Sequence, residues 1–80
     1  MLRTNVQEVI VDLIMAERQR QDQKFGRQDN DDFKWCTILG EEYGEVCQAA
    51  LKGDRNELMT ELIQVAAVAV AHLEALSLRL

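Results

Sequence analysis

One expected helix is apolar around its whole circumference, and this constrains the fold more than any other feature of the sequence. From Val65 to Leu73 every residue except His72 is apolar. At 100° per residue such a run leaves no polar face, which is typical of a helix that is enclosed on several sides. A chain of 80 residues is too short to enclose it alone. We therefore expect an all-α fold in which the chain forms a multi-helix bundle by oligomerisation, as a homodimer or homotetramer.

Capping patterns divide the chain into helices. Thr4 followed by Gln7 is a capping-box pattern, and Asp54 followed by Glu57 is another. Gly53 ends the segment before the second pattern, and there is no proline anywhere in the chain. No repeat or linker interrupts it, so residues 1–80 are expected to form a single domain. The expected helices cover about residues 4–24, residues 32–52, and a third segment from Asp54 to near the C-terminus.

Composition restricts the compartment and the partners. The net charge of −5 argues against direct binding of nucleic acid. Cys36 and Cys47 lie in one expected helix, too far apart to pair, so both are expected to be reduced thiols. The first residues lack a signal-peptide pattern, and the apolar run Val65–Ala71 is shorter than the roughly 20 residues of a membrane span. A cytoplasmic protein that does not enter the membrane is expected.

Three carboxylates in the stretch LGEEYGEV, residues 39–46, stand out because that stretch otherwise follows the apolar stripe of the second helix. On a helical wheel Glu42 falls inside this stripe, Glu45 falls at its border and Glu41 lies further out. A buried carboxylate without a partner costs several kcal/mol or takes up a proton, so this placement requires a cation or a strong hydrogen-bond donor.

The third helix offers further oxygen ligands. Glu61 lies on the same face as Val65 and Val68, and Gln64 follows it one turn later. Together with the carboxylates of the second helix, these side chains are suited to a hard divalent cation, and Mg²⁺ or Mn²⁺ fits best. The sequence has no His/Cys set at zinc spacing.

These two motifs carry a resemblance to a known group of enzymes. EEYGE, followed after fifteen residues by ELIQ, resembles the E-E-x-x-E … E-x-x-D pattern of the MazG-like, all-α nucleoside triphosphate pyrophosphohydrolases. ERQRQDQKFG with its acidic loop resembles the N-terminal segment of small members, of the phage or mobile-element type. The resemblance implies an oligomeric helical bundle and Mg²⁺-dependent hydrolysis of a triphosphate to monophosphate and pyrophosphate. It also implies that Glu41 or Glu42, with Glu45 and Glu61, are the metal-binding and catalytic carboxylates.

One residue departs from the pattern. The last motif position, usually Asp, is Gln64 here. An amide still offers a carbonyl oxygen to a metal, but the site loses one negative charge and binds a cation more weakly.

Cations and aromatic residues near the end of the first helix suggest a place for substrate. Arg20 and Lys24 continue the apolar stripe, where they are either an exposed helix end that complements the helix dipole or ligands of the triphosphate. Phe25 and Trp35 are candidate platforms for the base, although such residues are more often core; Phe25 is the stronger candidate because it follows a helix end that bears cations. His72 is too far along the third helix from Glu61 to share an ion and is expected to be a partnered core or interface residue.

Two functions follow. In the first, the protein is a Mg²⁺-dependent pyrophosphohydrolase of NTPs or dNTPs with a house-cleaning or nucleotide-pool role. In the alternative, it is a weak or inactive nucleotide-binding or helical oligomerisation module, whose acids pair with Arg18, Arg20 or Lys34.

Overall fold

The computed structural model describes residues 5–78 as three helices without strands. They are α1 (Asn5–Phe25), α2 (Asp32–Lys52) and α3 (Arg55–Leu78). The all-α class is confirmed, and each helix lies within a residue or so of its predicted range. The capping box predicted at Thr4 lies outside the described residues.

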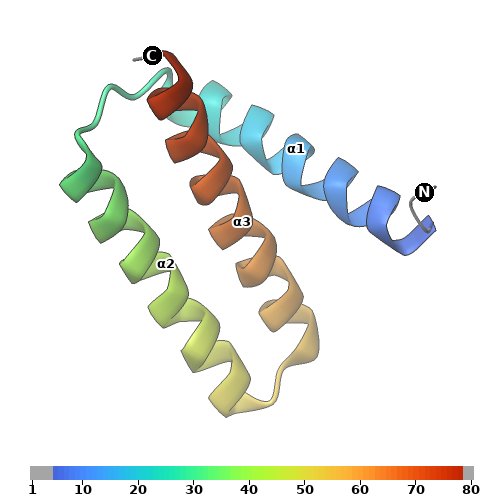
Figure 1. Ribbon diagram of the computed structural model, residues 1–80. Helices are drawn as coiled ribbons and strands as arrows, with labels where there is room; N and C mark the ends of the chain where they lie inside the picture. The colour runs from blue at the N-terminus through green and yellow to red at the C-terminus, as the bar shows by residue number, and fades with distance from the viewer. Residues whose placement is uncertain (1–4, 79–80) are drawn as a thin grey trace.

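α2 and α3 form a tight antiparallel hairpin (Figure 1). The side chain of Asp31 accepts a hydrogen bond of 2.8 Å from the backbone N–H of Lys34 and so caps α2. Gly53 ends the helix with φ at 73°, a left-handed conformation that glycine adopts without steric cost. Asp54 then caps α3, because its Oδ1 accepts a 3.0 Å hydrogen bond from the N–H of Glu57. The predicted caps at this turn are confirmed, and the short connection forces the two helices side by side.

The buried residues lie mainly between these two helices. Trp35 is 5% exposed and packs with Val68 and Ala71, while Ile38 and Leu39 cover the edge of this cluster. The other buried apolar residues are Val46, Ala49 and Ala67.

His72 closes the open end of the hairpin. Its ring stacks on Trp35 with the centroids 5.8 Å apart, and its Nε2 lies 3.0 Å from Oδ1 of Asp32. His72 is therefore a partnered histidine, as predicted.

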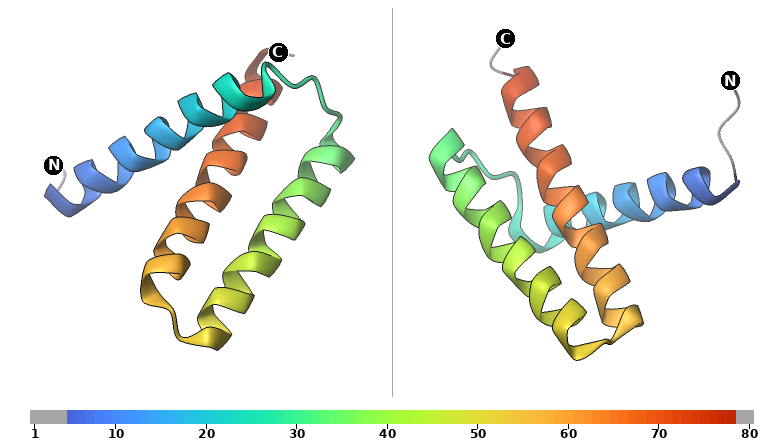
Figure 2. Two further views of the ribbon diagram at one scale, coloured as in Figure 1. Left: turned by 180° about the vertical axis from the view of Figure 1, so that it is seen from behind. Right: turned by 60° about the horizontal axis from the view of Figure 1, so that its bottom comes forward.

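α1 crosses α3, and its backbone lies away from that of α2 (Figures 1 and 2). Arg18 fastens this crossing. Its side chain is 10% exposed, and Nη2 lies 2.6 Å from Oε1 of Glu74 on α3 and 2.9 Å from Oδ1 of Asp22 on α1. We call Arg18, Asp22 and Glu74 the clamp. These two shortest distances are those of charge-assisted hydrogen bonds.

The N-terminal half of α1 extends away from the hairpin in every view (Figure 2). Its apolar stripe is largely exposed in the single chain, whereas an apolar surface of this extent is normally covered in a folded protein. The exposed apolar residues of this segment are Val6, Val9, Ile10, Val11, Leu13 and Met15.

α3 is only partly enclosed as well. Its length and apolar composition alone would suffice to cross a membrane, and 17% of its most apolar window is buried within the chain. A core helix of a soluble bundle has the same composition, and α3 also carries Glu61 and the clamp residue Glu74. Both exposed surfaces fit the predicted oligomer, which stays a prediction.

Cys36 and Cys47 are both free and exposed on α2. The prediction that they do not pair with each other is confirmed.

Candidate metal centre

The hairpin turn brings the two acidic motifs to the same level. Glu45 lies eight residues before Gly53 and Glu61 eight residues after it, while Glu42 and Gln64 each lie eleven residues away. In an antiparallel pair, residues at equal distances from the turn are neighbours across the interface. The sequence spacing between the motifs thus places the carboxylates of α2 opposite those of α3.

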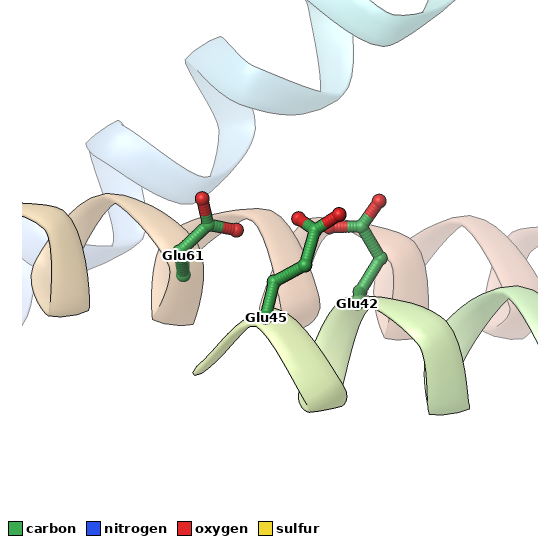
Figure 3. Close-up of side chains that lie close together, drawn as sticks. All are labelled: Glu42, Glu45 and Glu61. Atoms are coloured by element: carbon green, nitrogen blue, oxygen red, sulfur yellow. The ribbon is translucent and has the colours of Figure 1, made fainter. Parts of the chain in front are cut away.

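Glu42, Glu45 and Glu61 form a group that we call the carboxylate triad. One carboxylate oxygen from each lies within 4.8 Å of the other two. Figure 3 shows the three side chains pointing to one side of the hairpin, the side on which α1 crosses. Oxygens on opposite sides of a magnesium ion are about 4 Å apart, so small side-chain rotations would bring the triad to coordination distance.

Two carboxylate oxygens of the triad are buried without a hydrogen-bond partner in residues 5–78. Within residues 5–78, neither Oε2 of Glu42 nor Oε2 of Glu61 receives a hydrogen bond. Burial raises the pKa of Glu42, and the negative charges of Glu45, Glu17 and Glu41 raise it further. Acceptor oxygens that are dehydrated and crowded by like charge are stabilised by a proton or a cation.

Glu61 has the same electrostatic environment. Burial raises its pKa, and a hydrogen bond with Glu45, together with the charges of Glu45 and Glu42, adds to the effect. A cation bound at the triad would offset both the burial of these carboxylates and the repulsion between them.

No cationic side chain in the described part of the chain pairs with the triad. Arg18 is taken by the clamp, and Arg20 pairs with Glu17 at 2.6 Å. The alternative interpretation, in which the acids of the triad pair with Arg18, Arg20 or Lys34, is therefore wrong for these three glutamates. The oxygen donors, the unbonded buried atoms and the missing counter-charge all fit a hard divalent cation.

Glu41 lies outside the triad. It is exposed, although its charge still contributes to the raised pKa of Glu42. Gln64 is half-buried and lines the same cleft as Glu42, so its amide lies on the side of the hairpin where the triad opens.

All the predicted substrate-binding residues line one cleft of about 1290 Å³. The cleft lies against all three helices, and Glu42 forms part of its wall. Lys24 places its Nζ 5.1 Å from the centre of the Phe25 ring, a cation–π contact. The predicted residues in the lining are Arg20, Lys24, Phe25, Trp35, Glu42 and Gln64.

The two aromatic residues differ in their freedom to meet a ligand. Trp35 is 5% exposed and already stacks on His72, so its position favours the core interpretation. Its indole Nε1 is buried with no hydrogen-bond partner in residues 5–78. Phe25 is 58% exposed at the end of α1 and is the better platform for a base.

Glu17 belongs to this environment and was not among the predicted site residues. Its side chain is 13% exposed, it accepts hydrogen bonds of 2.8 and 2.6 Å from Nε and Nη2 of Arg20, and it lines the cleft with Glu42. The signal was present in the sequence, because Glu17 falls on the apolar stripe of its helix just as Glu42 does on its own.

Comparison with known proteins identifies a family. Residues 8–80 match the family model of phosphoribosyl-ATP pyrophosphohydrolase. No curated protein and no solved structure matches the chain.

Proposed function

The chain belongs to the phosphoribosyl-ATP pyrophosphohydrolase family, one of the all-α MazG-like families, and we propose on this premise that it is a Mg²⁺-dependent pyrophosphohydrolase. The family name specifies enzymes that hydrolyse a pyrophosphate bond of a nucleotide. Phosphoribosyl-ATP and the ordinary nucleoside triphosphates share the triphosphate chain. The proposed reaction is therefore hydrolysis of a triphosphate to the monophosphate and pyrophosphate.

The observation that supports this proposal best is the carboxylate triad. Three carboxylates from two helices converge within 4.8 Å, and none of them has a cationic partner among the described residues. Such an arrangement is unfavourable in a purely structural protein, because the repulsion is uncompensated.

We assign different roles to the three members. Glu42 and Glu61 hold the cation, because each has a buried oxygen that is not engaged in a hydrogen bond. A bound divalent cation supplies charge neutralisation of the phosphates and lowers the pKa of a water molecule. The amide oxygen of Gln64 is a further neutral ligand, whereas Glu41, exposed and outside the triad, is not required.

Glu45 is the proposed general base. It is the exposed member of the triad, so a water molecule can reach it from solvent. Its carboxylate accepts a proton as the water oxygen forms a bond to phosphorus, and the bond between the α- and β-phosphates breaks. The leaving group carries away the bridging oxygen and its electron pair; it is pyrophosphate if water attacks the α-phosphorus and the nucleoside monophosphate if water attacks the β-phosphorus.

Cationic residues of α1 are proposed to bind the phosphates. Arg20 and Lys24 line the cleft beside Glu42, and guanidinium and ammonium groups neutralise phosphate oxygens well. Phe25 is proposed to stack on the base, with Trp35 supporting the site from the core.

Gln64 supports a second candidate, a weakly active or inactive nucleotide-binding member of the family. A carboxylate at this position would add a fourth negative charge to the triad, and the amide does not. The two candidates differ in turnover rather than in cation binding.

The deciding experiment measures pyrophosphate release from phosphoribosyl-ATP and from a panel of ribo- and deoxyribonucleoside triphosphates, each with Mg²⁺, Mn²⁺ or EDTA. Metal-dependent release that is lost in Glu45→Gln supports the enzyme. Metal-dependent binding of a nucleotide without release supports the inactive member. If the protein neither binds a divalent cation nor releases pyrophosphate, both are excluded.

Other predictions remain part of the proposal. They are a single domain over residues 1–80, a small phage- or mobile-element-type protein, a cytoplasmic location, a role in the nucleotide pool and a homodimer or homotetramer.

A further inference from the structure

Glu17 and Arg20 form an ion pair at the wall of the cleft that Glu42 of the triad also lines. Both nitrogens on one edge of the Arg20 guanidinium donate to the carboxylate of Glu17, at 2.8 and 2.6 Å. Glu17 is nearly buried, with 13% of its side chain exposed, whereas 52% of the Arg20 side chain is exposed. One partner thus faces the protein and the other is free to move into solvent.

Glu17 also lies near Glu42, because the two residues line the same cleft and the negative charge of Glu17 contributes to the raised pKa of Glu42. The triad carboxylates point toward the side on which α1 crosses (Figure 3). The adjacent residue, Arg18, fixes this part of α1 to α3 through its 2.6 Å contact with Glu74. Glu17 therefore stands on an anchored segment and not on a loose helix end.

We propose that Glu17 is a fourth carboxylate of the cation site, and that Arg20 is its exchangeable counter-ion, displaced when a divalent cation binds. This inference rests on the proposed function. In the metal-free chain Arg20 neutralises Glu17. When the cation is bound, Glu17 turns toward it, either as a direct ligand or through a bound water, and the Arg20 guanidinium is released into the cleft.

Charge at the site supports this assignment. Gln64, one turn beyond Glu61, is a neutral amide, so the triad alone contributes three negative charges. α1 adds Glu17 as a fourth carboxylate, which makes up for the charge that is missing at Gln64. Arg20 can then bind a phosphate only after the cation has replaced it as the counter-ion of Glu17. Binding of the cation would therefore favour binding of the substrate.

The test uses two variants that break the same ion pair and are expected to act in opposite directions. Isothermal titration with Mn²⁺ alone should show weaker binding in Glu17→Gln, by about tenfold or more. Arg20→Gln removes a competitor for Glu17 and should bind Mn²⁺ several-fold more tightly. In the double variant the Arg20 substitution should have no further effect, because its competitor role requires Glu17.

Two measurements exclude simpler explanations. Glu8→Gln removes the same charge from an exposed position on α1 and should leave the Mn²⁺ affinity unchanged. In NMR spectra of the wild type, the Arg20 Nε–H signal, assigned by its loss in Arg20→Gln, should shift when diamagnetic Mg²⁺ is added. Circular dichroism checks that each variant is folded.

Several results would overturn the proposal. An unchanged Mn²⁺ affinity in Glu17→Gln, while Glu42→Gln abolishes binding, would overturn this inference and leave the proposed function intact. If Arg20→Gln tightens Mn²⁺ binding equally in the wild type and in Glu17→Gln, Arg20 acts only as a nearby positive charge, and its exchange with the cation is excluded. A wild type that binds no Mn²⁺ would overturn this inference and the proposed metal site together.

Discussion

The α2–α3 hairpin and α1 are built in different ways. The hairpin has capped helix ends, a left-handed glycine at its turn and a buried core around Trp35. α1 is attached by one clamp, and the apolar stripe of its N-terminal half is exposed. The triad carboxylates lie on the hairpin, and the cations proposed to meet the substrate lie on α1 beside its clamp.

This difference has a consequence for function. The distances within the triad depend on the register of a short turn, which local sequence determines, so the triad should persist in the isolated chain. The cleft depends on the position of α1, which requires the clamp and, in our proposal, a second copy of the chain over the exposed stripe. Substitutions in the hairpin should therefore affect mainly cation binding and turnover, and substitutions in α1 mainly association and stability.

The largest effect is expected for Glu42→Gln in the hairpin. It removes a buried acceptor of the triad and should abolish pyrophosphate release and weaken Mg²⁺ binding strongly. Without metal, relief of repulsion should leave the melting temperature equal or higher. Melting curves in EDTA and in Mg²⁺ measure both effects. The contrary outcome is a wild-type melting temperature that Mg²⁺ does not change, together with a mutant that melts several degrees lower in EDTA. It would show that a structural interaction holds Glu42 instead.

The next effect concerns α1. Ile10→Glu places a charge in the exposed stripe and should convert a dimer or larger species to monomer in sedimentation experiments at micromolar concentration, because a charge in an apolar interface is costly. Gln19→Glu adds the same charge at an exposed polar position of the same helix and is the control. A wild type that sediments as a stable monomer would contradict the bundle.

The clamp should have an intermediate effect. Glu74→Gln leaves Arg18 with Asp22 alone and should lower the stability by about 1.5 kcal/mol, since Glu74 is partly exposed and water replaces some of the interaction. Lys52→Gln breaks the exposed pair with Glu57 and should cost less than about 1 kcal/mol. Chemical denaturation measures both. Equal costs would mean that the clamp is no more than a surface ion pair.

The sequence predicted the hairpin better than α1. Gly53 and Asp54 are local signals for a turn, and the equal spacing of the two acidic motifs about Gly53 makes their approach predictable. The position of Glu42 on an apolar stripe indicated a buried charge, and its environment in the structure agrees.

The packing of α1 was less accessible to prediction. Arg18 looked like one of several cations, because its partner Glu74 lies 56 residues away and helical periodicity carries no information about which helix crosses which. Glu17 and Arg20 form an i,i+3 pair that helical spacing allows, whereas their position in one cleft with Glu42 followed only from the three-dimensional arrangement.

A smaller effect is expected with pH, and its sign follows from the triad. Glu42 and Glu61 have pKa values above their ordinary 4.5, so without metal their stabilising contribution is complete below 4.5 and is lost as pH rises through the folded pKa. In EDTA the melting temperature of the wild type should therefore fall more than that of Glu42→Gln between about pH 5 and pH 8. Mg²⁺ should remove this difference. Parallel curves in EDTA would contradict the raised pKa of Glu42.

The smallest effect is expected for Gln64→Asp, which adds a carboxylate at the level of Glu42 in the hairpin. Because charge count tunes cation affinity, Mg²⁺ binding should tighten several-fold or turnover should rise, while the metal-free protein should melt at the same or a lower temperature. Gln48→Asp adds the same charge at an exposed position of α2 and should do neither. If charge in the site is what matters, Gln64→Asp should also restore Mn²⁺ affinity to Glu17→Gln. No change in either background would mean that residue 64 does not face the cation, and that α1 alone completes the site.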